Sequence, residues 1–142
     1  MPSMLFASVD HPSIASYDVE GLAEWYCRNL GMRIIATNGG EPPSVLVGYA
    51  DVEKQGVSGA GTMIEIMPAN DPGPRPETFT RMQPGIRHIA IRVTDFATAL
   101  EHLTALGVRF TTEVGEALGG GRTVLFRDPE GNELQIVQRS IV

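Results

Sequence analysis

Residues 88–95, HIAIRVTD, repeat the pattern of residues 11–18, HPSIASYD, at an offset of 77. A second match, LGVRF at residues 106–110 against LGMRI at 30–34, has an offset of 76. Two matched anchors at nearly one offset indicate a tandem repeat. The 142-residue chain is therefore expected to form a single domain with module one at 5–67, a proline-rich linker at 68–85 and module two at 86–142.

The second module has a clear element order. Apolar residues alternate with other residues from 88 to 93, which predicts a half-buried strand. Asp95 is expected to cap a helix, and Gly107 suits the left-handed residue that ends it. Strands at 108–112, 122–127 and 133–138 follow. The helix carries apolar residues at helical spacing, namely Phe96, Leu100, Leu103 and Leu106.

The first module has the same order. A strand carrying His11 leads to the helix cap Asp18, and Gly31 ends the helix. Pro12 cannot donate a ladder hydrogen bond, so this strand should be at an edge or start irregularly. Strands are expected at residues 32–37, 44–50 and 62–67. The fold is thus α+β, with two βαβββ modules whose four-stranded sheets are each covered on one face by a helix and together enclose a cavity.

Strand alternation predicts which side chains face this cavity. Because Ile89 and Ile91 should pack under the helix, His88 faces the other way, and the repeat gives the same orientation to His11. The same argument assigns polar residues of the last strand of each module to the cavity. The predicted cavity residues are His11, Glu65, His88, Arg92, Glu133 and Gln135.

Two imidazoles, one carboxylate and a further oxygen donor suit one divalent metal ion such as Zn, Ni, Fe, Mn or Co. The predicted ligands are therefore His11, Glu65, His88 and Gln135. Each ligand comes from a different strand, so the site can form only in the folded protein.

The H-x6-D opening, the Trp25-Tyr26 pair before Leu30-Gly31, and the RDPEGN turn at 127–132 resemble the vicinal oxygen chelate superfamily. This superfamily includes glyoxalase I, methylmalonyl-CoA epimerase, extradiol dioxygenases and proteins of fosfomycin and bleomycin resistance. The resemblance implies that four strand positions hold a metal and that a carboxylate moves a proton next to a carbonyl. His11, Glu65 and His88 match the ligand positions.

The fourth position departs from the family's usual glutamate, because this chain has Gln135 there. An amide oxygen can bind a metal but cannot act as a base, which leaves Glu65 as the candidate catalytic carboxylate. Glu133, two residues earlier on the same face, is the alternative fourth ligand. Arg92 either forms a salt bridge to a cavity carboxylate or binds the anionic part of a substrate. His102 is expected to be a solvated helix residue.

Three functions are compatible with these residues. The first is a metal-dependent, glyoxalase-like lyase or isomerase that acts on a small carbonyl, hemithioacetal or thioester substrate through an enediolate. The second is an Fe(II)-dependent ring-cleaving dioxygenase using His11, His88 and Glu65. The third is a non-catalytic, antibiotic resistance-type protein that binds a small molecule.

Composition limits the partners and the location. The net charge of −6 and the lack of a Lys/Arg cluster argue against binding nucleic acid or anionic membranes. No apolar run is long enough to span a membrane, and Cys27 is the single cysteine, so a reducing cytoplasmic location is expected. The resemblance implies a homodimer, in which the modules that share a site belong to one chain or to two.

Overall fold

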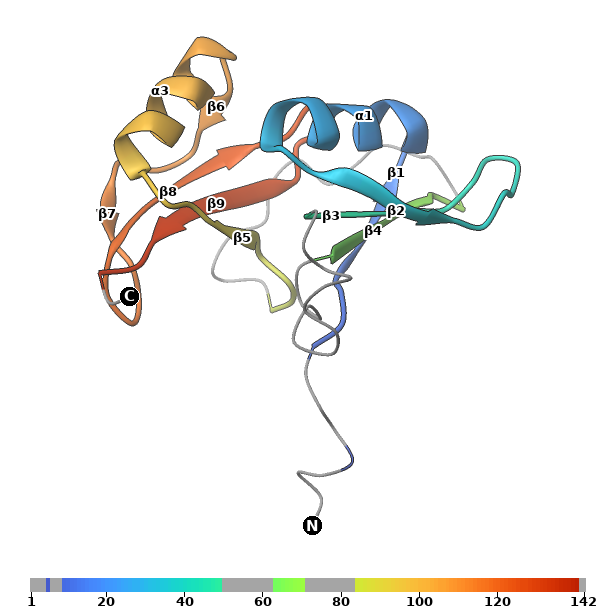
Figure 1. The fold of residues 1–142 in the computed structure, drawn as a ribbon, viewed down its shortest axis with the longest axis horizontal. Helices are drawn as coiled ribbons and strands as arrows, with labels where there is room; N and C mark the ends of the chain where they lie inside the picture. Colours follow the sequence, from blue (N-terminus) through green and yellow to red (C-terminus); the bar gives the residue numbers. More distant parts are fainter. Residues whose placement is uncertain (1–4, 6–8, 50–62, 71–83, 141–142) are drawn as a thin grey trace. The chain divides into compact units, whose positions relative to one another are not determined.

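A computed structural model describes residues 5, 9–49, 63–70 and 84–140. The chain forms two compact units, Met1–Arg75 (unit 1) and Pro76–Val142 (unit 2), and the described part of each combines a sheet with a helix (Figure 1). The predicted α+β class is confirmed. Most of the predicted linker, residues 71–83, lies outside the described residues.

Unit 1 contains a four-stranded mixed sheet in the order β1-β4-β3-β2. Strand β1 runs parallel to β4, and the other neighbours are antiparallel. Helix α1 lies along one face of this sheet (Figure 1). The elements are β1 (Ser13–Ser16), α1 (Val19–Leu30), β2 (Arg33–Thr37), β3 (Val45–Gly48) and β4 (Met63–Pro68).

Helix α1 has the predicted boundaries. The Asp18 carboxylate accepts a hydrogen bond from the Gly21 amide at 3.0 Å, and Gly31 ends the helix with a φ of 74°. Its buried stripe packs on the sheet residues that alternate with Glu65 along β4. The apolar residues buried in this unit include Val19, Leu22, Ala23, Tyr26, Val45, Val47, Ile64 and Ile66. Alternation therefore directs Glu65 to the sheet face opposite α1.

Unit 2 contains a second sheet with the path β5-β9-β8-β6, and β7 also pairs with β8. Strand β5 is parallel to β9, and the remaining pairs are antiparallel. The elements are β5 (Ile89–Arg92), α3 (Phe96–Ala105), β6 (Arg109–Phe110), β7 (Gly115–Glu116), β8 (Arg122–Arg127) and β9 (Glu133–Gln138).

Helix α3 is tied to its sheet at the N-terminus. Asp95 accepts from the Thr98 amide at 3.3 Å, and the Gln138 side-chain oxygen accepts from the Phe96 amide at 2.6 Å. Phe96 and Leu103 are buried, but Leu106 is 39% exposed and does not complete the predicted apolar stripe. On β8 and β9 the buried residues Val124, Phe126, Leu134 and Ile136 complete this core.

Three predicted strand details were wrong. The first strand does not carry His11, because β1 begins at Ser13; Pro12 contributes only its carbonyl, which accepts from the Glu65 amide at 2.9 Å. His88 likewise precedes β5. The strand expected at 108–112 is only Arg109–Phe110, because the chain then turns and pairs again with β8 through β7, which gives a five-stranded sheet.

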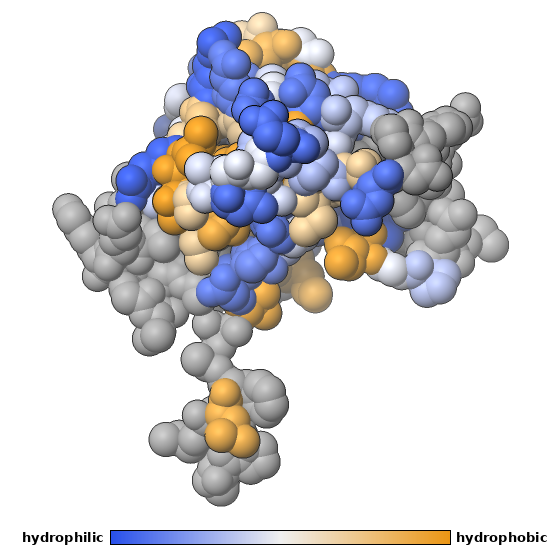
Figure 2. All heavy atoms as spheres, turned by 90° about the vertical axis from the view of Figure 1, so that its right-hand side faces the viewer, coloured by the Kyte–Doolittle hydropathy of each residue, from blue (hydrophilic) through white to orange (hydrophobic). Residues whose placement is uncertain are grey.

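The surface is mixed in polarity. On the face shown in Figure 2, hydrophilic residues surround separate apolar patches. Ile34 on the edge strand β2 is one exposed apolar residue, at 55%. Within the described residues, no helix is both long and apolar enough to cross a membrane.

Candidate metal centre

His11 and Glu65 come together in unit 1. The His11 Nε2 atom lies 3.6 Å from Glu65 Oε1, and the two side chains are 30% and 27% exposed. Register explains this contact, because Ser13 of β1 is the partner of Glu65 on β4, and His11 lies two residues before Ser13. The structure therefore brings together the two ligands that were predicted in the first module.

Asp10 orients the His11 ring. Its Oδ2 atom lies 2.7 Å from His11 Nδ1, so a proton on Nδ1 is donated to Asp10, and the Nε2 atom lies on the Glu65 side. The hydrogen bond to Asp10 raises the pKa of His11, partial burial opposes this, and the negative charges of Asp10 and Glu65 add to the rise. A carboxylate on the far nitrogen is the arrangement that commonly fixes a metal-binding histidine.

Ser13 holds the Glu65 carboxylate. The Ser13 hydroxyl donates to Glu65 Oε1 at 2.8 Å, which is the same oxygen that lies near His11. The carboxylate is thus fixed on one oxygen, while Oε2 has no partner among the described residues. A carboxylate held in this way can accept a proton or bind a cation without losing its position.

Unit 2 repeats this register with different side chains. Ala90 of β5 pairs with Gln135 of β9 as Ser13 pairs with Glu65, so Gln135 is the structural counterpart of Glu65. His88 lies two residues before Ala90, as His11 lies two before Ser13. Its side chain is exposed and has no hydrogen-bond partner in the part of the chain that the structure describes.

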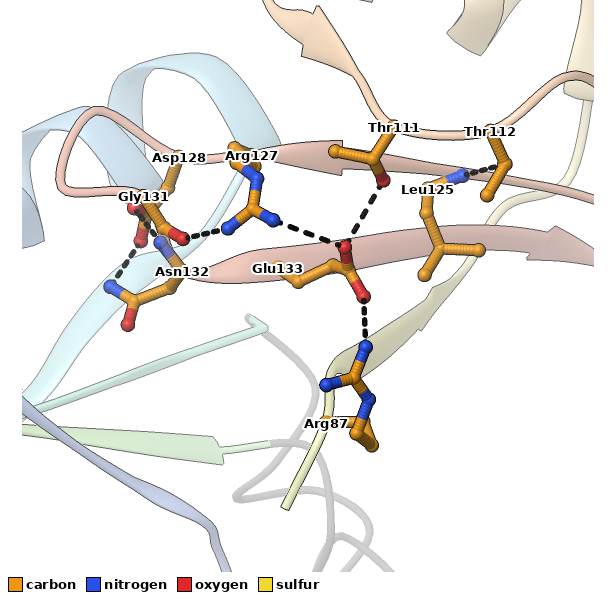
Figure 3. A network of polar contacts seen from close by, with 9 residues as sticks. All are labelled: Arg87, Thr111, Thr112, Leu125, Arg127, Asp128, Gly131, Asn132 and Glu133. Carbon is orange, nitrogen blue, oxygen red and sulfur yellow. Dashed lines mark hydrogen bonds and ion pairs between the residues drawn. The ribbon is translucent and has the colours of Figure 1, made fainter. Parts of the chain in front are cut away.

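Glu133 lies in a polar network of unit 2 (Figure 3). Arg87 Nη2 lies 3.9 Å from Glu133 Oε1, and Arg127 Nη2 lies 3.7 Å from Oε2. The Thr111 hydroxyl donates to Oε2 at 3.1 Å. Both oxygens of Glu133 therefore face positive or donating groups, which favours Gln135 over Glu133 as the fourth ligand.

Arg92 and His102 lie where alternation and spacing predicted them. Arg92 is exposed on β5, on the same sheet face as Ala90, and has no salt-bridge partner among the described residues. His102 is exposed in the last turn of α3. Two interpretations of Arg92 were predicted, a salt bridge to a cavity carboxylate and binding of a substrate anion. Arg92 forms no salt bridge with any described carboxylate.

Each unit contributes one histidine and one oxygen donor of the predicted ligand set. Within the described residues, no three side chains of the His, Cys, Asp or Glu type form a group suited to a metal ion. In kind, the donors fit a divalent transition metal, since imidazole, carboxylate and amide oxygen all bind such ions. Asp10 and Ser13 were not among the residues predicted from the sequence, although both lie within two residues of His11.

The comparison with protein families identifies the fold. The sequence model of the Glyoxalase/Bleomycin resistance protein/Dioxygenase superfamily matches residues 8–136. The chain belongs to this superfamily. The resemblance predicted from the motifs is thereby confirmed for the superfamily as a whole. The curated proteins contain no match to this chain.

Several solved structures resemble the chain over nearly its full length. A superfamily member from Sphaerobacter thermophilus is 25% identical, with a TM-score of 0.67, and the match covers 95% of this chain and 99% of that chain. The fosfomycin resistance protein FosX from Listeria monocytogenes, in complex with Mn(II) and sulfate ion, is 17% identical, with a TM-score of 0.64 and coverage of 96% and 93%. TnmS3, an antibiotic-binding protein from Streptomyces sp. CB03234, is 22% identical, with a TM-score of 0.64 and coverage of 95% and 98%.

Proposed function

We propose that this superfamily member is a metal-dependent, glyoxalase-like lyase or isomerase. Its substrate is a small carbonyl, hemithioacetal or thioester compound, and the reaction passes through an enediolate. The observation that carries the proposal is the Glu65 carboxylate, held by Ser13 and lying 3.6 Å from His11 on the sheet face opposite α1. A fixed carboxylate beside an imidazole suits proton transfer next to a carbonyl group.

We further propose that His11, Glu65, His88 and Gln135 hold one divalent metal ion, which is Zn, Ni, Fe, Mn or Co. Such an ion, when bound, acts as a Lewis acid toward the carbonyl oxygen. The support is the chemistry of the donor set and the equivalent register positions of Glu65 on β4 and Gln135 on β9. Each histidine lies two residues before the β-sheet partner of one of these side chains. The Mn(II) in the related FosX structure agrees with this choice of ions.

Four residues of this chain have separate roles in the proposed reaction. Glu65 takes the proton from the carbon next to the carbonyl and returns it on completion of the reaction. Ser13 keeps one carboxylate oxygen in place while the other is open for this transfer. Gln135 offers an amide oxygen that cannot accept the proton at neutral pH, so the transfer belongs to Glu65. Arg92, exposed on the same face as Ala90, binds an anionic group of the substrate.

The oligomeric state, location and partners of the enzyme are part of the same proposal. A reducing cytoplasm agrees with the single cysteine, and a homodimer is what the family resemblance implies. The partner of the protein is then its small-molecule substrate, and neither nucleic acid nor a membrane is involved.

The experiment is a rate measurement with each divalent metal in turn, using methylglyoxal–thiol adducts and an acyl-CoA epimer as substrates. Turnover should require the metal, and Glu65→Gln should reduce it by about 10²-fold to 10⁴-fold, the usual contribution of a positioned acid–base group. Glu101→Gln is the matched control, because the same change on the exposed face of α3 should leave the rate unchanged. Full activity of Glu65→Gln, or no turnover of either substrate with any metal, would contradict the proposal.

A further inference from the structure

The network around Glu133 contains more positive charge than its single carboxylate balances. Register makes Arg127 the partner of Glu133 across β8 and β9, and Arg109 the partner of Arg127 across β6 and β8. These three side chains therefore point to one face of the sheet, the face of Gln135 and opposite α3. Arg87 reaches the same carboxylate from the segment before β5 (Figure 3).

The guanidinium groups of Arg87 and Arg127 near Glu133 have hydrogen-bond donors that are not used. Their distances to the carboxylate, 3.7 and 3.9 Å, exceed hydrogen-bonding range, and the direct hydrogen bond of Glu133 comes from Thr111. Arg127 Nη1 donates to the Gly131 carbonyl at 2.7 Å. Arg127 Nε and Arg87 Nη1, however, are buried and lack a hydrogen-bond partner within the described structure. Buried donors without acceptors are costly, so the cluster has hydrogen-bond donors that a further acceptor would satisfy.

Arg109 adds a third guanidinium to this row. It is exposed, it has no salt-bridge partner among the described residues, and it lies directly opposite Arg127. Like charges at directly opposite strand positions repel each other. An anion that contacts both would remove this repulsion, and an oxyanion matches the fork geometry of guanidinium groups.

We propose that Arg87, Arg109 and Arg127 form an oxyanion-binding subsite for a carboxylate or phosphate group. Glu133 acts as an internal counter-ion that holds two of the three guanidinium groups in place when no ligand is present. Assignment of the bound oxyanion to the substrate rests on the proposed function, whereas the anion affinity of unit 2 does not.

The position of the subsite defines a substrate class. Arg92 is the partner of Val137, four residues along β9 from Glu133, which corresponds to about 13 Å of strand. Gln135 lies between these two ends. A substrate that contacts Arg92 and the subsite at once therefore carries one anionic group on each side of its reacting carbonyl.

The test is calorimetric titration of metal-free protein with inorganic phosphate and with malonate, against sodium chloride at equal ionic strength. Saturable binding of either probe is expected, and the tighter probe identifies the phosphate or carboxylate class. Arg109→Gln should weaken this binding about tenfold, the order expected for losing one charged hydrogen-bonding group. Arg28→Gln changes an exposed arginine of α1 in unit 1, and this variant should bind both probes as the wild type does. No saturable binding, or an unchanged Arg109→Gln, overturns the subsite.

A second variant has an effect of opposite sign. Glu133→Gln removes the internal counter-ion but keeps an acceptor for Thr111, so phosphate or malonate should bind more tightly than to the wild type. An unchanged or weaker affinity in a variant with a wild-type circular dichroism spectrum contradicts the subsite; if the variant does not fold, Arg109→Gln decides. Anion binding without turnover would remove the proposed activity and leave the subsite, and turnover without anion binding would do the reverse.

Discussion

Glu65 in unit 1 and Gln135 in unit 2 occupy equivalent positions of a repeated sheet, yet their surroundings differ. Glu65 has the Ser13 hydroxyl beside it and His11 nearby, whereas the counterpart of Ser13 in unit 2 is Ala90. Unit 2 has its carboxylate two residues earlier, at Glu133, between two arginines. The repeat thus fixes where side chains project, and the identity of the side chains differs between the units, which is why we propose proton transfer in unit 1 and anion binding in unit 2.

Exchanging the side chains at positions 65 and 135 should change the rate of turnover the most. The double variant Glu65→Gln/Gln135→Glu keeps one carboxylate in the ligand set but moves it to unit 2. Turnover should stay about 10²-fold to 10⁴-fold below wild type, since the moved carboxylate has lost Ser13 and the neighbouring His11. Steady-state kinetics with saturating metal measures this. Recovery to near the wild-type rate would mean that the two units are interchangeable.

Asp10→Asn should have the next largest effect. The asparagine cannot polarise the His11 ring as a carboxylate does, and metal affinity should fall about 10-fold to 100-fold, the range known for such supporting groups. Calorimetric titration with Zn or Mn gives the dissociation constant. Asp95→Asn is the control, since that carboxylate caps α3. Equal metal affinity for Asp10→Asn and wild type would show that this contact does not support the site.

Gln135→Glu should change the metal affinity in the opposite direction. A second carboxylate in the ligand set raises its negative charge, and divalent metal affinity should rise about tenfold. Glu133→Gln in the same assay tests the alternative ligand and should leave metal affinity within about twofold of wild type. A large loss of metal affinity in Glu133→Gln would identify Glu133 as the fourth ligand instead.

Ser13→Ala should have the smallest effect. Loss of one hydrogen bond to the partly exposed Glu65 should lower kcat about threefold to tenfold, because the net contribution of a typical intramolecular hydrogen bond is on the order of 1 kcal/mol. KM should change little, because Ser13 contacts the Glu65 carboxylate and has no proposed contact with the substrate. The matched variant Ala90→Ser places the same hydroxyl beside Gln135 and should not alter kcat. Similar effects of the two variants would remove the distinction between the units.

The fold was largely accessible from the sequence. Caps at Asp18 and Gly31 and the apolar spacing between them predicted α1 at its observed ends, since local backbone chemistry controls helix boundaries. Strand ends were less accessible. Whether β1 includes His11 depends on pairing with β4, which lies more than fifty residues away, and β7 forms through pairing with β8 rather than from any local pattern.

For the candidate site, the sequence predicted which sheet face each side chain lies on, but not which side chains contact one another. Alternation alone assigned Glu65 and Gln135 to equivalent faces, and the register of both sheets agrees. The network of Glu133 was missed, because it depends on long arginine side chains that strand patterns do not orient. A signal was nevertheless present: the turn at 128–132 makes Arg127 and Glu133 opposite residues of a hairpin.

We propose that His11 and His88 bind the same ion, and Co(II) titration followed by visible absorption is the decisive experiment. We predict saturation at one equivalent per chain, and loss of the ligand-field bands in both His11→Ala and His88→Ala but not in His102→Ala. A wild-type spectrum in either of the first two variants would contradict a shared ion.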